Sequence, residues 1–572
     1  MKRDTPSAAP SGAMRWGSDA IAATLAALDL RYIALNPGSS YRGLHDSLVN
    51  YLGNENPALL TCLHEEHAVA IAHGYAKVTG RPMAVALHSN VGLMHATMAI
   101  YNAFCDRVPM LILGATGPLD AARRRPWIDW IHTGGDQGAL IRSFCKWDDQ
   151  PGSPQAAIDS VMQAHYMTRT YPSAPTYVCL DSYVQEQALS EGLALPDPKR
   201  FKEPEPPAPS PQALTRAAAI LARAARPLIL MGRVSAGEEH WQARIELAER
   251  LGACVLTDLK TPAAFPSDHR LNPAVPGLWL TPTGRELAEA ADVILSLDWI
   301  DLAGTLGSVS HTATVISATL DHTLHNGWSK DHFGLPAADL QVAAHPDALV
   351  SALLKEVDGV AAREGWPPTL TTAPQPGQPS ADGLPMGELV DVLSSALNGG
   401  ETCLVRVPLG LDGASLKVDA PLDYLGHDGG GGLGSGPGMA VGAALGLSGG
   451  DRLAVAVLGD GDFLMGSSAI WTAVHYGLRL LIVVANNRSF FNDEVHQGQV
   501  ARARERPVEN SWLGQHIREP DPDLAALARS LGAVGYGPVQ DEAALSEVLA
   551  QAVETARAGA VVVVDVRVSA DG

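Results

Sequence analysis

Short, almost wholly apolar runs recur along this chain, and longer amphipathic stretches separate them. Such alternation predicts parallel β-strands joined by covering helices, because each strand of a buried parallel sheet is apolar on both faces. We therefore expect an α/β fold built from doubly wound parallel sheets. Strands are predicted at YIAL, LLTCL, MAVAL and MLIL in the first part, at PLILMG, ACVLTD and DVILSL in the middle, and at TCLVRV, LAVAVLG, LLIVVA and AVVVVDV in the last part.

Two proline-rich segments divide the chain into three blocks. Residues 195–212 contain seven prolines among alternating charges, and residues 366–380 have a similar composition. Segments of this kind cannot form a core and are typical of exposed linkers. The sequence thus predicts three doubly wound domains, over residues 14–187, 213–360 and 384–568, each of ordinary domain size.

Composition narrows the range of partners and locations. The chain has 41 Lys and Arg against 62 Asp and Glu, a formal net charge of −21. An acidic surface repels phosphate backbones and anionic headgroups, so we expect neither nucleic acid nor membrane as a partner. The six cysteines are scattered singly, which favours a reducing, cytoplasmic location.

The third block carries the most specific motif. A predicted buried strand ends at Gly459-Asp460-Gly461, and the next predicted strand ends at Asn486-Asn487. A helix is predicted between them, over about residues 464–476. If the strands are parallel neighbours, Asp460 and Asn487 can lie side by side at their carboxyl ends. A carboxylate, an amide oxygen and a nearby carbonyl suit Mg²⁺, and the helix after Gly461 suits phosphate.

The first block has polar residues directly after three of its predicted strands. These include Ser39 after YIAL, Glu65 after LLTCL and His88 after MAVAL. Parallel strands would gather the three side chains at one rim of the sheet, where α/β proteins bind ligands.

The Asp460 and Asn487 motif resembles that of the thiamine diphosphate-dependent decarboxylase and acetolactate synthase superfamily. That resemblance implies a pyrimidine-binding domain, a central domain and a diphosphate-binding domain, in this order. It also implies that thiamine diphosphate is held with Mg²⁺, and that Asp460, Asn487 and the Ser489 carbonyl are the metal ligands. The implied cofactor-binding residues are Glu65, Leu433, Gly434, Gly459, Asp460, Gly461, Asp462 and Asn487.

Within the superfamily, segments around Asn36-Pro37-Gly38-Ser39, His88 and Gly431 to Gly434 resemble benzoylformate decarboxylase-like members. The resemblance implies that Glu65 is the acid–base partner of the cofactor's pyrimidine ring. Glu66 is the alternative if the match to the family motif is shifted by one residue. It implies that Leu433 supports the bent cofactor, and that Ser39 and His88 orient the substrate and move protons.

The implied reaction is the non-oxidative decarboxylation of a 2-oxo acid. Asn492 and His496 would make the pocket more polar than a phenyl group requires, and His496 is a further candidate acid–base group. One alternative is an acetolactate synthase-like carboligase, and a second is a non-catalytic cofactor-binding subunit. The resemblance also implies a homodimer or homotetramer with active sites between subunits, and it leaves open whether the central domain binds a nucleotide such as FAD.

Two other motifs resemble a dinucleotide site and a zinc site, but each lacks a feature that such a site requires. Residues 429–434 fit a GxGxxG pattern, but no buried strand precedes them, as a dinucleotide site requires. His64 and His67 flank two glutamates three residues apart, not four as in HExxH, so we expect no zinc.

Overall fold

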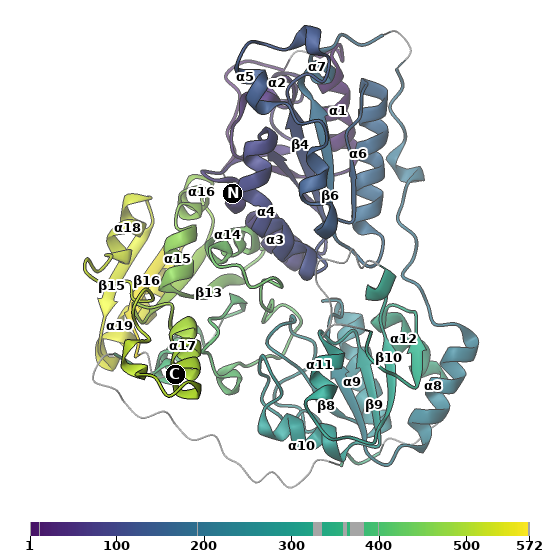
Figure 1. Cartoon of the computed structure of the whole chain (residues 1–572), viewed down its shortest axis with the longest axis vertical. Coiled ribbons are helices and arrows are strands. Elements are labelled where there is room, and N and C mark those ends of the chain that lie inside the picture. The colour runs from purple at the N-terminus through teal and green to yellow at the C-terminus, as the bar shows by residue number, and fades with distance from the viewer. Residues whose placement is uncertain are drawn as a thin grey trace. The chain divides into compact units, whose positions relative to one another are not determined.

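The computed structural model of the protein describes residues 2–10, 12–190, 193–323, 335–357, 363–366, 383–398 and 400–569. The chain divides into two compact units, Met1–Pro204 with Asp428–Arg567 and Glu205–His427 with Val568–Gly572. Three parallel sheets with covering helices confirm the predicted fold class (Figure 1). The domain limits stay predictions, and the second proline-rich segment, apart from Trp366, lies outside the described residues.

The first sheet belongs to the first unit and has the strand order β2-β1-β3-β4-β6-β5. Every neighbouring pair is parallel, so all six carboxyl ends lie along one edge. Its strands are β1 (Tyr32–Leu35), β2 (Ala58–Thr61), β3 (Met83–Leu87), β4 (Met110–Thr116), β5 (Trp147–Asp149) and β6 (Pro175–Asp181). Its helices are α1 (Gly17–Ala27), α2 (Arg42–Asp46), α3 (Glu65–Thr79), α4 (Ser89–Cys105), α5 (Ile128–His132), α6 (Pro154–Arg169) and α7 (Ser182–Glu186).

The second unit holds a parallel sheet of order β11-β10-β9-β7-β8. Its strands are β7 (Pro227–Met231), β8 (Cys254–Leu256), β9 (Val293–Leu297), β10 (Thr314–Ala318) and β11 (Leu340–Val342). The unit also contains α8 (Pro211–Arg223), α9 (Glu238–Leu251), α10 (Pro282–Ala290), α11 (Leu302–Gly307), α12 (Pro346–Glu356), α13 (Met386–Leu397) and β12 (Thr402–Arg406). Across the described residues of both units, no helix has the length and apolar character needed to span a bilayer.

The third sheet runs, within the first unit, in the order β13-β14-β16-β15, again with all pairs parallel. Its strands are β13 (Leu453–Gly459), β14 (Leu480–Asn486), β15 (Val534–Val539) and β16 (Val561–Arg567). Its helices are α14 (Ser435–Gly446), α15 (Asp460–Gly466), α16 (Ala469–His475), α17 (Phe491–Ala503), α18 (Leu524–Ser530) and α19 (Glu542–Arg557). The single helix predicted after Gly461 is therefore wrong: helix begins at Asp460, and Ser467 and Ser468 separate two short helices.

Helices α3 and α14 pack against each other within the first unit, backbone against backbone (Figure 1). A Cβ atom at Gly442 would lie 1.9 Å from the carbonyl oxygen of Ile71, and one at Gly74 would lie 2.1 Å from that of Met439. Only glycine permits this approach, because backbone atoms cannot move aside as a flexible side chain can. The helix that begins at Glu65 is thereby fixed against the helix that follows the glycine-rich loop.

Gly442→Val is expected to lower the free energy of unfolding by about 3 kcal/mol, the upper end of the usual cost of overpacking, since the added side chain meets rigid backbone. Gly449→Ala is the matched control, because no atom lies within 4 Å of the added Cβ, and it should change stability by less than about 0.5 kcal/mol. Urea unfolding of both variants checks the prediction. Equal midpoints would contradict the close approach of the two helices.

Candidate functional site

The carboxyl ends of β2, β1 and β3 lie side by side, because β1 pairs in parallel with both neighbours. Helix α3 begins at Glu65, four residues after β2, and His88 directly follows β3. The structure thus brings Glu65 and His88 to one rim of the sheet. Ser39 follows β1 at the same rim, but its side chain is exposed, and its role stays a prediction.

Glu65 is buried, with 5% of its surface exposed. Its Oε2 lies 3.0 Å from Nδ1 of His95 on α4. A Cβ at Gly92 would lie 3.3 Å from Glu65 Oε1, so the glycine leaves space beside the carboxylate. His64 caps α3 by accepting the Glu66 amide hydrogen, and its ring stacks on that of His95.

His88 is held on two sides. Its Nδ1 lies 2.8 Å from Oγ of Ser40, the serine after the predicted Ser39, and its ring packs edge-on against that of His132. A Cβ at Gly38 would lie 2.2 Å from the His88 ring. Burial lowers the pKa of His88, and the neighbouring His132 lowers it further. The imidazole therefore stays neutral, able to accept a proton, at a lower pH than usual.

Glu66 and His67 face the C-terminal part of the same unit. Burial raises the pKa of Glu66, with a further rise from Asp462. His67 Nδ1 lies 3.1 Å from Oγ of Ser468, and burial lowers the pKa of His67 to about 4. The two adjacent glutamates thus have different surroundings, and Glu65 is the one that faces the histidines of the first sheet.

The second part of the site lies where β13 and β14 end. These strands pair in parallel with Gly459 opposite Ala485, which brings Asp460 and Asn487 to the same edge. Asp460 is only 3% exposed, and its Oδ2 has no hydrogen-bond partner within the described part of the chain. Burial raises the pKa of Asp460 to about 6, and the nearby Asp565 adds to the rise.

An orphaned buried carboxylate is unfavourable unless a cation or a donor joins it. The side-chain oxygen of Asn487 is available to hold a cation together with Asp460. Asn486 donates through Nδ2 to Asp565 Oδ1 at 2.8 Å, while Oδ1 of Asn487 accepts the backbone N–H of Ser489 at 3.0 Å. The donor set of carboxylate, amide and carbonyl oxygens fits a hard divalent cation such as Mg²⁺.

Asp462 connects this edge to the glycine-rich loop before α14. Its Oδ1 accepts the backbone N–H groups of Gly434 at 2.7 Å and Gly436 at 3.3 Å. Leu433, which directly precedes Gly434 in this loop, has 36% of its surface exposed. The loop therefore presents a partly exposed apolar side chain, while its backbone is held in place by Asp462.

Two predicted residues lie at the surface. His496 and Asn492 are exposed on α17, and their roles stay predictions. Four residues that the sequence analysis missed, namely Ser40, His95, His132 and Asp565, touch the site. Asp565 alone had a visible signal, as a charged residue within the apolar run AVVVVDV.

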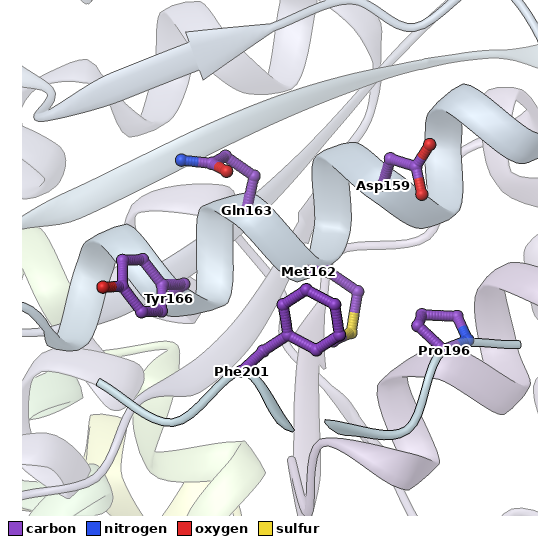
Figure 2. Close-up of a pocket in the computed structure, with 6 residues that line it drawn as sticks. All are labelled: Asp159, Met162, Gln163, Tyr166, Pro196 and Phe201. Atoms are coloured by element: carbon purple, nitrogen blue, oxygen red, sulfur yellow. The ribbon is translucent and has the colours of Figure 1, made fainter. Parts of the chain in front are cut away.

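A separate cavity of about 360 Å³ lies beside α6, where Met162 and Tyr166 meet Pro196 and Phe201 of the segment after α7 (Figure 2). Asp159 and Gln163 are its polar lining residues. None of the rim residues lines it, so we assign it no part in the site.

Comparison with protein families matches all three blocks. The thiamine pyrophosphate enzyme models match residues 15–140 (N-terminal TPP-binding domain), 214–330 (central domain) and 411–566 (C-terminal TPP-binding domain). Thiamine pyrophosphate and thiamine diphosphate are the same cofactor.

Curated relatives have several activities. A sulfoacetaldehyde acetyltransferase of Rhodobacter capsulatus is 29% identical, but over 50% of this chain and 44% of its own length. Benzoylformate decarboxylase of Pseudomonas aeruginosa is 24% identical over 75% of this chain and 78% of its own. Acetolactate synthase 2 of Nicotiana tabacum is 22% identical over 91% and 77%, respectively.

Solved structures share the fold. Benzoylformate decarboxylase from Polynucleobacter necessarius superposes with a TM-score of 0.78 at 20% identity, covering 97% of this chain and 99% of that one. The thiamine diphosphate-dependent 4-hydroxybenzoylformate decarboxylase of Rhodococcus jostii RHA1 has the same TM-score at 19% identity, with the same coverage.

Proposed function

The chain belongs to the thiamine diphosphate-dependent enzymes of the decarboxylase and acetolactate synthase superfamily, and on that premise we propose that it decarboxylates a 2-oxo acid without oxidation. The observation that carries the proposal is the rim of Glu65 and His88, with His88 hydrogen-bonded to Ser40. The substrate is a 2-oxo acid more polar than benzoylformate.

Mg²⁺ would be held by Asp460, Asn487 and the carbonyl of Ser489, and the diphosphate by Gly459, Gly461 and neighbouring amides. The orphaned Oδ2 of Asp460 supports this assignment. Thiamine diphosphate, when bound, supplies a nucleophilic carbon for the 2-oxo group and an electron sink for the departing carboxylate's electrons.

Each protein residue then has a definite task. Glu65 holds a proton at the pyrimidine ring, and its burial excludes water from that proton. Neutral His88 accepts or returns a proton at the reacting carbon, while Ser40 fixes the orientation of its ring. Ser39, exposed beside them, would contact the substrate carboxylate, and Leu433 would support the cofactor ring.

We further propose a homodimer or homotetramer in the cytoplasm, with active sites between subunits. The exposed apolar side chains of Met94, Leu433 and Met465 support a partner subunit, because burying apolar side chains against one is favourable. The singly scattered cysteines support a reducing compartment.

An NMR time course with thiamine diphosphate, Mg²⁺ and a panel of 2-oxo acids tests the reaction. Loss of one acid with release of its aldehyde supports decarboxylation. An acyloin or acetohydroxy acid as main product would instead show the carboligase reaction. If no acid is consumed while the cofactor binds, decarboxylation is wrong.

Mg²⁺ affinity is expected to depend on pH through Asp460. The pKa of its carboxyl is raised to about 6 by burial, so protons compete with the metal below that pH. Affinity should fall about tenfold for each pH unit below about 6 and stay level above about 7. Calorimetric titration in two buffers of different ionisation enthalpy measures both the affinity and the released proton. A constant affinity through pH 6 would contradict the assignment.

A further inference from the structure

A second cavity in the first unit lies in the segment after β4. It has a volume of about 470 Å³, and Arg124, Arg125, Trp127, Asp129, Trp130 and Thr133 are among the residues that line it. We call it the Arg124 pocket. Its volume suits a small organic molecule.

Both tryptophans of the pocket are highly exposed to solvent. Trp127, just before helix α5, is 70% exposed, and Trp130, within α5, is 79% exposed. Trp127 also has a φ of +64°, a conformation that bulky residues rarely adopt. Such a backbone persists where the surrounding structure enforces it, often at binding sites. Bare indoles favour a flat apolar group, because their faces stack on aromatic rings.

The charges of the pocket do not cancel. Arg125 forms two hydrogen bonds with Asp129, through Nε at 3.1 Å and Nη2 at 2.8 Å, so that pair is neutral. Arg124 donates instead to the carbonyl oxygens of Pro118 and Leu119, both at 2.8 Å. Among the salt bridges of the described residues, none involves Arg124. A positive charge is therefore anchored in the pocket of a chain whose net charge is −21.

The pocket adjoins the candidate site. Asn90 donates to the carbonyl of Ile131 at 3.2 Å, and Ser89 donates to that of His132 at 2.5 Å. These bonds tie α5 to the start of α4, directly after His88. The His132 ring contacts that of His88, and the next residue, Thr133, lines the pocket. The segment that lines the Arg124 pocket is therefore bonded directly to the segment that carries His88.

We propose that the Arg124 pocket binds the far end of the substrate, and that this end consists of an aromatic ring bearing a negatively charged group. The inference rests on the proposed function, because it assumes that the 2-oxo group reacts beside His88. Arg124 would bind the anion, and Trp127 and Trp130 would contact the ring. Bidentate contact with a carboxylate is the geometry that a guanidinium provides.

Two substrates of equal shape test the charge preference. The wild-type protein should convert (4-carboxyphenyl)-2-oxoacetate with a kcat/KM at least about tenfold above that of the 4-carbamoyl compound. Arg124→Gln should bring the ratio to within about threefold, through KM for the charged acid alone. Arg123→Gln is the control, since that guanidinium lies over the Tyr183 ring and does not line the pocket. An unchanged ratio in Arg124→Gln overturns the proposal.

A binding measurement separates this inference from the reaction itself. In saturation-transfer NMR, benzoate should bind the holoprotein and benzamide should bind more weakly, and Arg124→Gln should remove the benzoate signal. Trp127→Ala and Trp130→Ala should weaken it. Arg124-dependent benzoate binding without turnover of any 2-oxo acid would support the pocket and defeat the proposed reaction. Benzoate binding that does not depend on Arg124 would overturn the proposal that this pocket binds the substrate. A change of oligomer size in Trp127→Ala would also overturn it, because it would show that the tryptophans belong to a subunit interface.

Discussion

Replacing Glu65 with glutamine is expected to lower the turnover of 2-oxo acids by at least about 100-fold, because glutamine keeps the shape of the side chain but cannot carry a proton. Thiamine diphosphate and Mg²⁺ should still bind, since apart from Glu65 the residues proposed to hold them belong to the C-terminal part of the chain. Steady-state kinetics and calorimetry together measure the two effects.

Glu66→Gln is the matched control for Glu65→Gln. The Glu66 carboxylate lies toward Asp462, away from the histidines around Glu65, so its loss should cost turnover less than about tenfold. If Glu66→Gln instead caused the larger loss, the catalytic role would pass to Glu66. If neither change altered the protein's function in any assay, the non-catalytic cofactor-binding subunit would be the better description.

Asp460→Asn should have the second large effect. The substitution should weaken Mg²⁺ binding but stabilise the metal-free protein. Loss of a charged ligand is expected to weaken Mg²⁺ binding by at least about 100-fold, and cofactor binding with it. Without metal, the variant should be more stable than the wild type. The native pKa of Asp460 is about 6, above the ordinary value near 4, so the stability contributed by this group falls as pH rises through that window.

At neutral pH, the difference of about two pKa units corresponds to about 3 kcal/mol of unfavourable burial, which asparagine removes. Thermal unfolding at pH 7, with and without Mg²⁺ and cofactor, measures both effects. Asp451→Asn, at an exposed position, should change neither. A metal-free Asp460→Asn protein less stable than the wild type would contradict the picture of an uncompensated buried charge.

The positions of the strand ends could be predicted from sequence, because a buried parallel strand is an uninterrupted apolar run and its end is marked by the first polar residue. For this reason the positions of Glu65, His88 and Asp460 after three strands could be predicted. The contacts between side chains from different segments could not be predicted. Ser40 and Ser39 are identical in type and adjacent, and only the turn after β1 decides which one meets His88.

His95 illustrates the same limit. It lies within α4, 30 residues after Glu65, where a histidine has no feature in the sequence that distinguishes it from a surface residue. The interruption between α15 and α16 was also missed. Ser467 and Ser468 are compatible with a helix, so its end there depends on tertiary packing, not on local preference.

The glycine contacts between α3 and α14 restrict how this protein can diverge. Each helix begins beside one half of the proposed reaction machinery, and neither can shift sideways without a collision of main-chain atoms. Descendants of this sequence can therefore change substrate only through segments outside that contact. The stretch after β4, with its bare tryptophans and anchored arginine, is free of it and can be rebuilt without disturbing the spacing on which the chemistry depends.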